Sequence, residues 1–184
     1  MPPTRIEGKT IAFLLTDGFE DSELTSPWQA VVDAGGSPVL VSPRPEGVTG
    51  KNGHSQAVDR DIAEADPGDY DGLMLPGGVV NADHLRMDER SVAFARGFFE
   101  QHKPVAVICH GPWLLVEAGV VHGRTLTSYP SLRTDLENAG ATWVDREVAV
   151  DSGLVSSRTP ADLPAFNAKM IEEFAEGLHR RQTA

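Results

Sequence analysis

The sequence feature that most constrains the fold is a series of short apolar runs, rich in β-branched residues, with helical patterns between them. Each run is almost continuously apolar and does not alternate strictly between apolar and polar residues. Strands covered by helices on both faces have this pattern, so a parallel sheet is favoured. The runs are residues 11–15, 38–41, 72–75 and 105–108, with a shorter one near Leu126.

The segments between these runs predict helices, several of which end at a glycine. The alternation of strand and helix predicts a doubly wound α/β fold, with a mainly parallel sheet flanked by helices on both faces. A chain of 184 residues suits one domain, which we assign to residues 1–184. The predicted helices are residues 22–34, 90–101, 112–118, 131–138 and 161–177.

Two segments depart from the alternating pattern. Residues 43–60 are rich in proline and glycine, which predicts a loop with a small hairpin outside the main sheet. Residues 142–157 alternate between polar and apolar side chains around Asp151-Ser152-Gly153. This second pattern predicts an antiparallel hairpin at a sheet edge.

Composition narrows the expected partners and location. The net charge of −11 disfavours nucleic acid or an anionic membrane as the main partner. One cysteine cannot form an internal disulfide, so no oxidising compartment is required. The first residues lack the apolar core of a signal peptide, and no run approaches the roughly 18 apolar residues of a membrane span. We therefore expect a cytoplasmic location.

Cys109, the only cysteine, stands where the apolar run 105–108 gives way to a turn. Gly111 and Pro112 follow, and then a helical pattern, so the thiol is predicted at the apex of a strand–turn–helix elbow. The positive end of the helix would favour the thiolate, which predicts a low thiol pKa and a reactive nucleophile. The alternative is a small buried hydrophobic residue.

Parallel strands bring their carboxyl ends to one edge, so the segments after the runs 11–15, 72–75 and 105–108 are expected to meet there. Gly77 and Gly78 follow the second of these runs, and their N–H groups, with the amide of His110, are predicted to hold an oxyanion. A plain Pro-Gly-Gly turn is the alternative.

An acid and a base complete the predicted chemistry. Glu20, or a neighbouring acid, is expected to have a raised pKa and to donate a hydrogen bond to the sulfur, although this segment also reads as a helix start. His110 needs a third group to orient its ring, and no acid stands out nearby in the sequence. The remaining five histidines show no ligand spacing, so no metal is predicted: His54, His84, His102, His122 and His179.

Several motifs, spread from about Lys9 to Glu176, together resemble the PfpI/ThiJ family of the class I glutamine amidotransferase-like superfamily. Any one of them would be a weak match, whereas their combination spans nearly the whole chain. The motifs are Phe19-Glu20-Asp21 with Glu23-Leu24, Leu75-Pro76-Gly77-Gly78, Ile108-Cys109-His110-Gly111-Pro112, Thr127-Ser128-Tyr129-Pro130 and residues 156–163.

The resemblance implies a flavodoxin-like sandwich with Cys109 as nucleophile and Glu20 as the protonated acid beside it. It also implies an oxyanion site from the Gly78 and His110 amides, and a homo-oligomer, a dimer or larger, with an interface near the crevice. In the protease-like branch a neighbouring subunit supplies the third triad residue, which matches Asp83 here. Two further positions bear on this match: Ala82 replaces a proline common before that acid, and Tyr129 matches a residue lining the family's crevice.

Two kinds of function remain open. The first is a stress-related, cofactor-free hydrolase in which the thiolate attacks a small carbonyl or a peptide, as a peptidase or a glyoxal or methylglyoxal deglycase. The second is an oxidation sensor or chaperone-like stress protein whose cysteine oxidises to sulfinic acid. A glutamine amidotransferase is disfavoured, because the His-x-Glu tripeptide that completes its triad does not follow Cys109.

Overall fold

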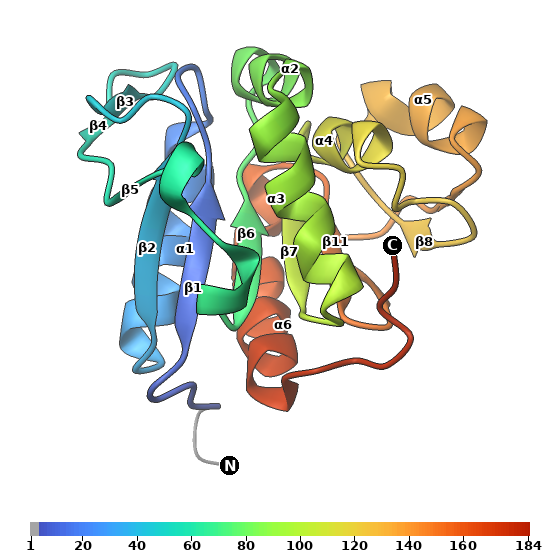
Figure 1. The fold of residues 1–184 in the computed structure, drawn as a ribbon. Helices are drawn as coiled ribbons and strands as arrows, with labels where there is room; N and C mark the ends of the chain where they lie inside the picture. Colours follow the sequence, from blue (N-terminus) through green and yellow to red (C-terminus); the bar gives the residue numbers. More distant parts are fainter. Residues whose placement is uncertain (1–3) are drawn as a thin grey trace.

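The computed structural model describes residues 4–184 and contains a central sheet of seven strands (Figure 1). The strands lie in the order β10-β11-β7-β6-β1-β2-β5, and every neighbouring pair is parallel except β10 with β11. Their bounds are β1 (Thr10–Leu14), β2 (Ser37–Ser42), β5 (Arg60–Asp61), β6 (Gly72–Leu75), β7 (Val105–Ile108), β10 (Ala149–Asp151) and β11 (Leu154–Ser157).

Helices cover both faces of this sheet, and each face has its own hydrophobic core (Figure 1). Residues Leu73, Leu75 and Val107 of β6 and β7 point to one core, and Met74 and Ile108 point to the other. The helices α1 and α6 pack together on one face, and α2, α3 and α4 on the other. The bounds are α1 (Asp21–Asp33), α2 (Val79–Met87), α3 (Glu89–Glu100), α4 (Pro112–Glu117), α5 (Arg133–Asn138) and α6 (Leu163–Glu176).

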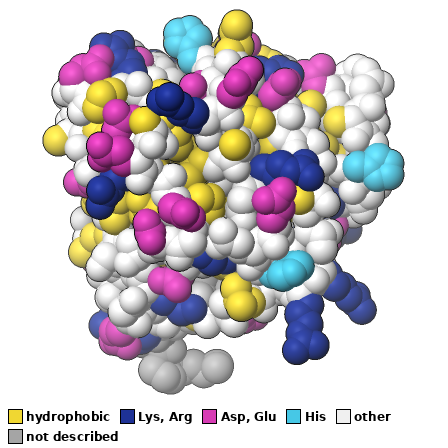
Figure 2. Space-filling model, viewed as in Figure 1, with side chains coloured by type: hydrophobic (Ala, Val, Ile, Leu, Met, Phe, Trp, Pro, Cys, Tyr) yellow, Lys and Arg dark blue, Asp and Glu magenta, His cyan; other side chains and the backbone are white. Residues whose placement is uncertain are grey.

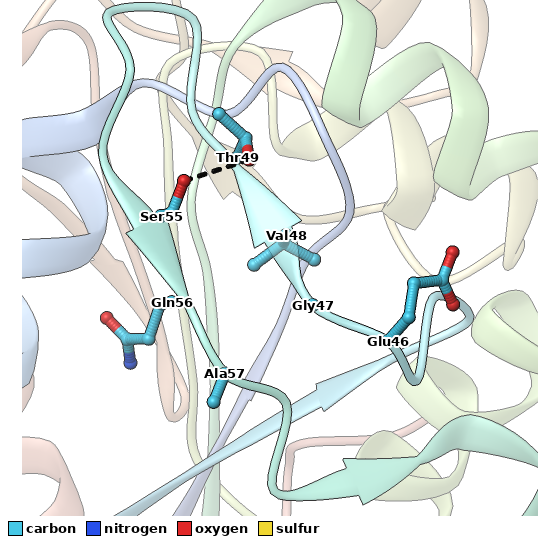
Figure 3. A pocket seen from close by; sticks show the side chains of 7 residues that line it. All are labelled: Glu46, Gly47, Val48, Thr49, Ser55, Gln56 and Ala57. Carbon is cyan, nitrogen blue, oxygen red and sulfur yellow. Dashed lines mark hydrogen bonds between the residues drawn. The ribbon is translucent and has the colours of Figure 1, made fainter.

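Two small sheets lie outside the main one. The hairpin of β3 (Val48–Thr49) and β4 (Ser55–Gln56) is antiparallel, and the Thr49 and Ser55 hydroxyls lie 3.1 Å apart across it (Figure 3). The strands β8 (Thr125–Leu126) and β9 (Thr142–Trp143) form a parallel pair. The hairpin matters for function because its turn reaches the site described below.

The predicted doubly wound α/β fold is confirmed, as are the strands at the four long apolar runs and the antiparallel hairpin at the sheet edge. Two expectations differ from the structure. The run near Leu126 forms β8 in the small sheet, because β11 occupies the position beside β7. Helix α2 was not predicted, since its exposed residues, such as Asp83 and His84, leave only a narrow apolar face.

Figure 2 shows acidic and basic side chains interspersed on the face it presents. Within residues 4–184, none of the helices combines the length and the apolar composition that a membrane crossing needs.

Candidate active site

Cys109 lies at the carboxyl end of β7 on a strained turn, with a φ of 61° that non-glycine residues rarely adopt. Its N–H donates to the Ser157 carbonyl at 3.1 Å, and its own carbonyl accepts from the Tyr129 N–H at 2.9 Å. A Cβ at Gly111 would stand 3.0 Å from the Leu75 carbonyl oxygen, so this position has room only for glycine. These contacts hold the turn, and they confirm the predicted elbow.

The carboxyl beside this cysteine belongs to Glu23, in the first turn of α1. The Glu23 side chain is fully buried, and its Oε2 accepts from the Gly77 N–H at 2.7 Å. A Cβ at Gly77 would meet Glu23 Oε2 at 2.5 Å and the Cys109 Cβ at 2.7 Å. Glu23 and Cys109 therefore flank the α-carbon of Gly77, which brings carboxyl and thiol together.

Glu20 differs from its predicted position beside the sulfur. It precedes α1 with an extended backbone, and its side chain lies at the rim, where it pairs with Lys51 and accepts from Asn52 Nδ2 at 3.3 Å. The turn that carries Lys51 and Asn52 is fixed by Asp21, which accepts from the N–H groups of Asn52 and His54 at 2.8 and 2.7 Å. One helical turn later the chain faces the sheet, so Glu23 is the acid that points inward.

Burial is the largest influence on the pKa values of the Glu23 carboxyl and the Cys109 thiol. It raises the pKa of Glu23 to about 7. Burial, followed by the negative charge of Glu23, raises the pKa of the Cys109 thiol to about 12, although hydrogen bonds from the Gly78 and His110 amides favour the thiolate. The predicted low thiol pKa is therefore wrong. The six-residue helix α4 does not offset the loss of water and the adjacent carboxylate.

The imidazole of His110 touches the sulfur, with 3.2 Å between Nδ1 and Sγ. Its other nitrogen, Nε2, lies 3.4 Å from the Ser131 hydroxyl, and the ring stacks on Tyr129 with centroids 4.7 Å apart. Burial, followed by the positive charge of Lys51, lowers the pKa of His110. The lowered pKa favours the neutral form of the ring.

Asp83 does not meet His110 within the part of the chain that the structure describes. It is exposed on α2 and lines a separate surface pocket of about 570 Å³ together with Arg86 and Arg96. Its assignment as the acid that orients His110 from a neighbouring subunit stays a prediction, since only a second chain could bring the two together.

Gly77 and Gly78, which were both predicted to hold an oxyanion, have different roles in the structure. The Gly77 N–H is taken by Glu23, so it does not point into the crevice as expected. The N–H groups of Gly78 and His110 face the sulfur. A Cβ at Gly78 would stand 2.4 Å from the Gly18 carbonyl oxygen, and its φ of 90° also requires glycine.

These groups share one cavity of about 300 Å³, open to the surface at the carboxyl edge of the sheet. Side chains and backbone from six segments line it: Glu20, Glu23, Lys51, Gly78, Val79, Cys109, His110, Tyr129 and Pro160. The predicted site residues Cys109, His110, Glu20, Gly78 and Tyr129 all reach it. Asp83 does not, and Gly77 lies directly behind it.

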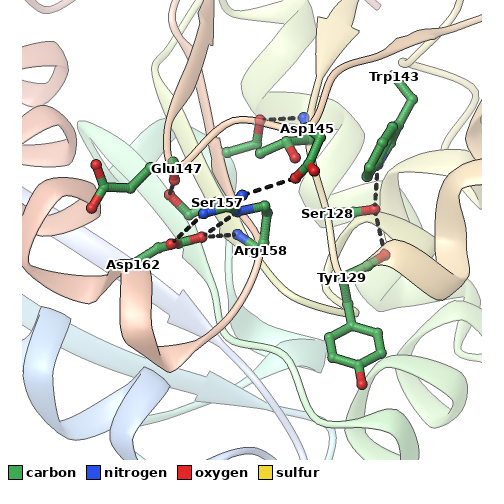
Figure 4. Close-up of polar contacts among 10 residues, drawn as sticks. Ser128, Tyr129, Trp143, Asp145, Glu147, Ser157, Arg158 and Asp162 are labelled. Atoms are coloured by element: carbon green, nitrogen blue, oxygen red, sulfur yellow. Dashed lines mark hydrogen bonds and ion pairs between the residues drawn. The ribbon is translucent and has the colours of Figure 1, made fainter.

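The part of the cavity rim that carries Pro160 is held by a network of hydrogen bonds around Arg158 (Figure 4). Its guanidinium forms two hydrogen bonds to the buried Asp162, at 2.9 and 3.0 Å, and one to Asp145 at 2.8 Å. This network fixes the loop that places Pro160 at the cavity. Ser128 holds the segment that carries Tyr129, because its hydroxyl accepts from Trp143 Nε1 at 3.0 Å and donates to the Tyr129 carbonyl at 2.8 Å.

The chain therefore belongs to the class of flavodoxin-like α/β proteins that carry a cysteine at a strand–helix turn, here with a buried acid beside it. Within this class the sequence model of the DJ-1/PfpI family matches residues 9–173. The chain belongs to the DJ-1/PfpI family. The resemblance seen in the sequence motifs is thereby confirmed.

Named relatives are similar over nearly their whole length. Protein/nucleic acid deglycase 2 of Escherichia coli is 47% identical over 166 residues, covering 89% of this chain and 96% of the relative. YraA of Bacillus subtilis, whose name classes it provisionally among the cysteine proteases, is 46% identical over 164 residues, with coverage of 89% and 96%. The crystal structure of Drosophila melanogaster DJ-1beta has a TM-score of 0.86 at 27% identity, covering 92% of this chain and 91% of that one.

Proposed function

We propose that this protein is a cofactor-free cysteine hydrolase of the PfpI type that acts on small carbonyl adducts, and relatives that are named deglycases support this proposal. The observation that carries the proposal is the pairing of Cys109 with Glu23, whose pKa of about 7 suits a proton acceptor at neutral pH. A group with that pKa is half ionised where the reaction runs, so it can take a proton and return it.

In the first step the Glu23 carboxylate accepts the thiol proton while the Cys109 sulfur attacks the carbonyl carbon. The sulfur electron pair forms the S–C bond, and the C=O π pair moves onto oxygen. The N–H groups of Gly78 and His110 are available to donate to that oxyanion, as they favour negative charge on the sulfur in the free protein. The thiol needs no low pKa of its own, because the proton leaves as the bond forms.

In the second step the adduct becomes a thioester. An amide does so by expelling its amine, which takes the proton from Glu23. For a 2-oxoaldehyde, Glu23 first returns its proton to the oxyanion, which gives a hemithioacetal. The freed carboxylate then takes the proton from the former aldehyde carbon and delivers it to the neighbouring carbonyl carbon, while the hydroxyl proton moves to the second oxygen. An adduct of a 2-oxoaldehyde with an amine enters this route after it has released the amine. Water then attacks the thioester, His110 accepts a proton from it, and the cysteine leaves as thiolate to be reprotonated.

The size of the cavity and the lack of a carboxylate beside His110 within the described residues favour small carbonyl adducts over peptides. The cavity of about 300 Å³ is at the lower end of the volumes that hold small ligands. Within the described residues, His110 Nε2 faces a serine hydroxyl and no carboxylate. Peptide cleavage requires a well-oriented histidine to serve a poor leaving group, and so depends on Asp83 from a second subunit.

The test supplies methylglyoxal, a methylglyoxal-modified lysine derivative and a fluorogenic peptide to the purified protein, and measures 2-hydroxy acid, free amine and fluorescence. Cys109→Ala should abolish turnover, and Glu23→Gln should lower it roughly 10²- to 10⁴-fold. Glu20→Gln is the matched control at the rim and should retain turnover within a few-fold. Turnover that survives in Cys109→Ala would refute the proposal.

The oxidation sensor remains the second candidate on one observation: Cys109 is the only cysteine, so no second thiol can resolve a sulfenic acid. The Gly78 and His110 amides would then bind sulfinate oxygens instead of an oxyanion. A mass increase of two oxygen atoms at Cys109 in mild peroxide, without turnover of any of the three substrates, would favour this candidate.

A further inference from the structure

A second cluster of titratable side chains lies at the carboxyl end of α6. Glu173, Glu176 and His179 each offer one ligand atom, and these atoms lie within 4.8 Å of one another. The helix ends at Glu176, and Gly177, with a φ of 81°, turns the chain so that His179 folds back over Glu173. The His179 N–H donates to the His102 carbonyl at 2.8 Å, which fixes this return.

Glu173 is buried, whereas the His179 side chain is 16% exposed and its ring meets Glu173. The Glu173 side chain is only 7% exposed. His179 Nε2 is inaccessible and has no hydrogen-bond partner within residues 4–184, although it lies 3.3 Å from Glu173 Oε2. This contact is an ion pair only when the imidazole is protonated, and a cation between the two atoms would give the neutral ring a partner.

The spacing of the ligand atoms fits a small cation. In a tetrahedral site with metal–ligand distances of about 2.0–2.1 Å, neighbouring ligand atoms stand about 3.3 Å apart. His179 Nε2 is 3.3 Å from Glu173 Oε2 and 3.9 Å from Glu176 Oε2. The Glu176 side chain is 54% exposed and free to adjust by a few tenths of an ångström.

The electrostatic surroundings also favour a cation. The last carbonyl groups of a helix carry a partial negative charge, and α6, with 14 residues, ends at this cluster. The nearby Lys169 already pairs with Glu172, 3.0 Å away, and does not occupy the cluster.

We propose that Glu173, Glu176 and His179 bind a divalent transition cation of the Zn²⁺ type, with water at the fourth position. One imidazole nitrogen and two carboxylate oxygens suit Zn²⁺ better than Mg²⁺ or Ca²⁺, which prefer oxygen ligands alone. The sequence analysis predicted no metal because it compared histidines with one another. Here the ligands are one histidine and two glutamates at steps of three residues.

The site is separate from the Cys109 cavity and would have a structural role. Phe174 of α6 packs on Gly72, where β6 begins, whereas Cys109 follows the end of β7, so the two sites lie at opposite edges of the sheet (Figure 1). A cation bound to His179 would tie the C-terminal segment to α6. That segment packs onto the domain through Gln182, which is fully buried.

The experiment uses tag-free, metal-stripped Cys109→Ser protein, since a thiol could also bind Zn²⁺. Calorimetric titration with Zn²⁺ should give one site per chain, and Co²⁺ should give visible absorption bands of a tetrahedral complex. His179→Gln and the exposed substitution Glu176→Gln should each weaken Zn²⁺ binding roughly tenfold or more. His122→Gln, at an exposed histidine elsewhere, should leave it unchanged. Zn²⁺ at a hundredfold excess over its Kd should raise Tm by about 5–10 °C.

Three results would overturn the proposal. The first is the absence of stoichiometric Zn²⁺ binding by Cys109→Ser, which would leave an ordinary His179–Glu173 ion pair. The second is unchanged affinity in both His179→Gln and Glu176→Gln, and the third is an equal loss in His122→Gln. Because Glu176 is exposed, a folding defect in Glu176→Gln is not expected, and circular dichroism checks this.

Discussion

Replacement of Glu23 by glutamine should make the protein more stable at pH 8 and much less active. The Glu23 carboxyl is fully buried, Gly77 satisfies one oxygen, and the other, Oε1, has no partner of hydrogen-bond geometry within residues 4–184. Burial raises the Glu23 pKa from 4.5 to about 7. Folding therefore favours the protonated carboxyl, and ionisation of that carboxyl costs stability.

The size of the effect follows from the pKa shift. One pKa unit corresponds to 1.36 kcal/mol, so the shift is worth about 3 kcal/mol. Because the folded pKa lies above the unfolded one, this stabilisation is fully present below pH 4.5 and is lost as pH rises through about 7. Glutamine stays neutral and can still accept from the Gly77 N–H. Its advantage at pH 8 should reach about 3 kcal/mol, or roughly 6–12 °C in Tm.

The assay is thermal unfolding of wild type and Glu23→Gln at pH 5 and pH 8, with Glu20→Gln as the matched control. The difference in Tm between wild type and Glu23→Gln should grow from pH 5 to pH 8, while Glu20→Gln should follow the wild type. Alkylation of Cys109 by iodoacetamide gives a second reading, and its midpoint should fall in Glu23→Gln, where the opposing negative charge is gone. A Glu23→Gln protein no more stable than wild type at pH 8, with an unchanged alkylation midpoint, would refute the reasoning.

Three further predictions concern the same site. Turnover of wild type should rise roughly tenfold between pH 6 and pH 8, as the Glu23 carboxyl with its pKa of about 7 ionises, and the rise should be absent in Glu23→Gln; a pH-independent wild-type rate would contradict this. Gly77→Ala should lower the free energy of urea unfolding by about 2–3 kcal/mol, because its Cβ would stand 2.5 Å from Glu23 Oε2. The control Gly123→Ala lies in open space and should cost only the strain of its φ of 74°, about 1 kcal/mol. Equal losses in the two variants would count against the close fit at Gly77. Asp83→Asn should lower peptide cleavage more than adduct turnover, and wild-type peptide cleavage should increase with protein concentration as subunits associate; a concentration-independent rate unaffected by Asp83→Asn would remove Asp83 from the site.

The fold could be predicted because the amino-acid composition of each strand indicates whether its two faces are buried. The run 105–108 is apolar at every position and is buried on both faces, which is the condition the pattern indicated. The helix α2 has no comparable signal, since only Asn81, Ala82 and Leu85 are buried and its first turn lacks a side-chain cap. Its position depends on Gly78, whose backbone conformation starts the helix and which the sequence showed only as part of a turn.

The choice between Glu20 and Glu23 shows where sequence reasoning about the site reached its limit. The predicted helix, residues 22–34, already places Glu20 before the helix and Glu23 in its first turn, but a pattern of residue types does not say which of the two side chains points toward the cysteine. The structure places the helix start at Asp21, so Glu20 turns toward Lys51 and Glu23 toward the sheet. A register argument could have found Glu23, since Leu24 and Pro27, at neighbouring positions on the same helix face, are also buried.

The same buried acid explains why the expected low thiol pKa was wrong and why this does not count against catalysis. A cysteine kept ionised in the free protein would be reactive toward any electrophile, whereas burial of Cys109 and the Glu23 charge keep the proton on sulfur. In the proposed mechanism the proton leaves when Glu23 is ionised and a carbonyl is in position to receive the sulfur electrons. Ionisation of the buried Glu23 lowers the stability of the protein at pH 8. In return, the proposed mechanism gains a nucleophile that is activated only by its substrate. Glu23→Gln should separate these two effects, because it should gain stability and lose turnover.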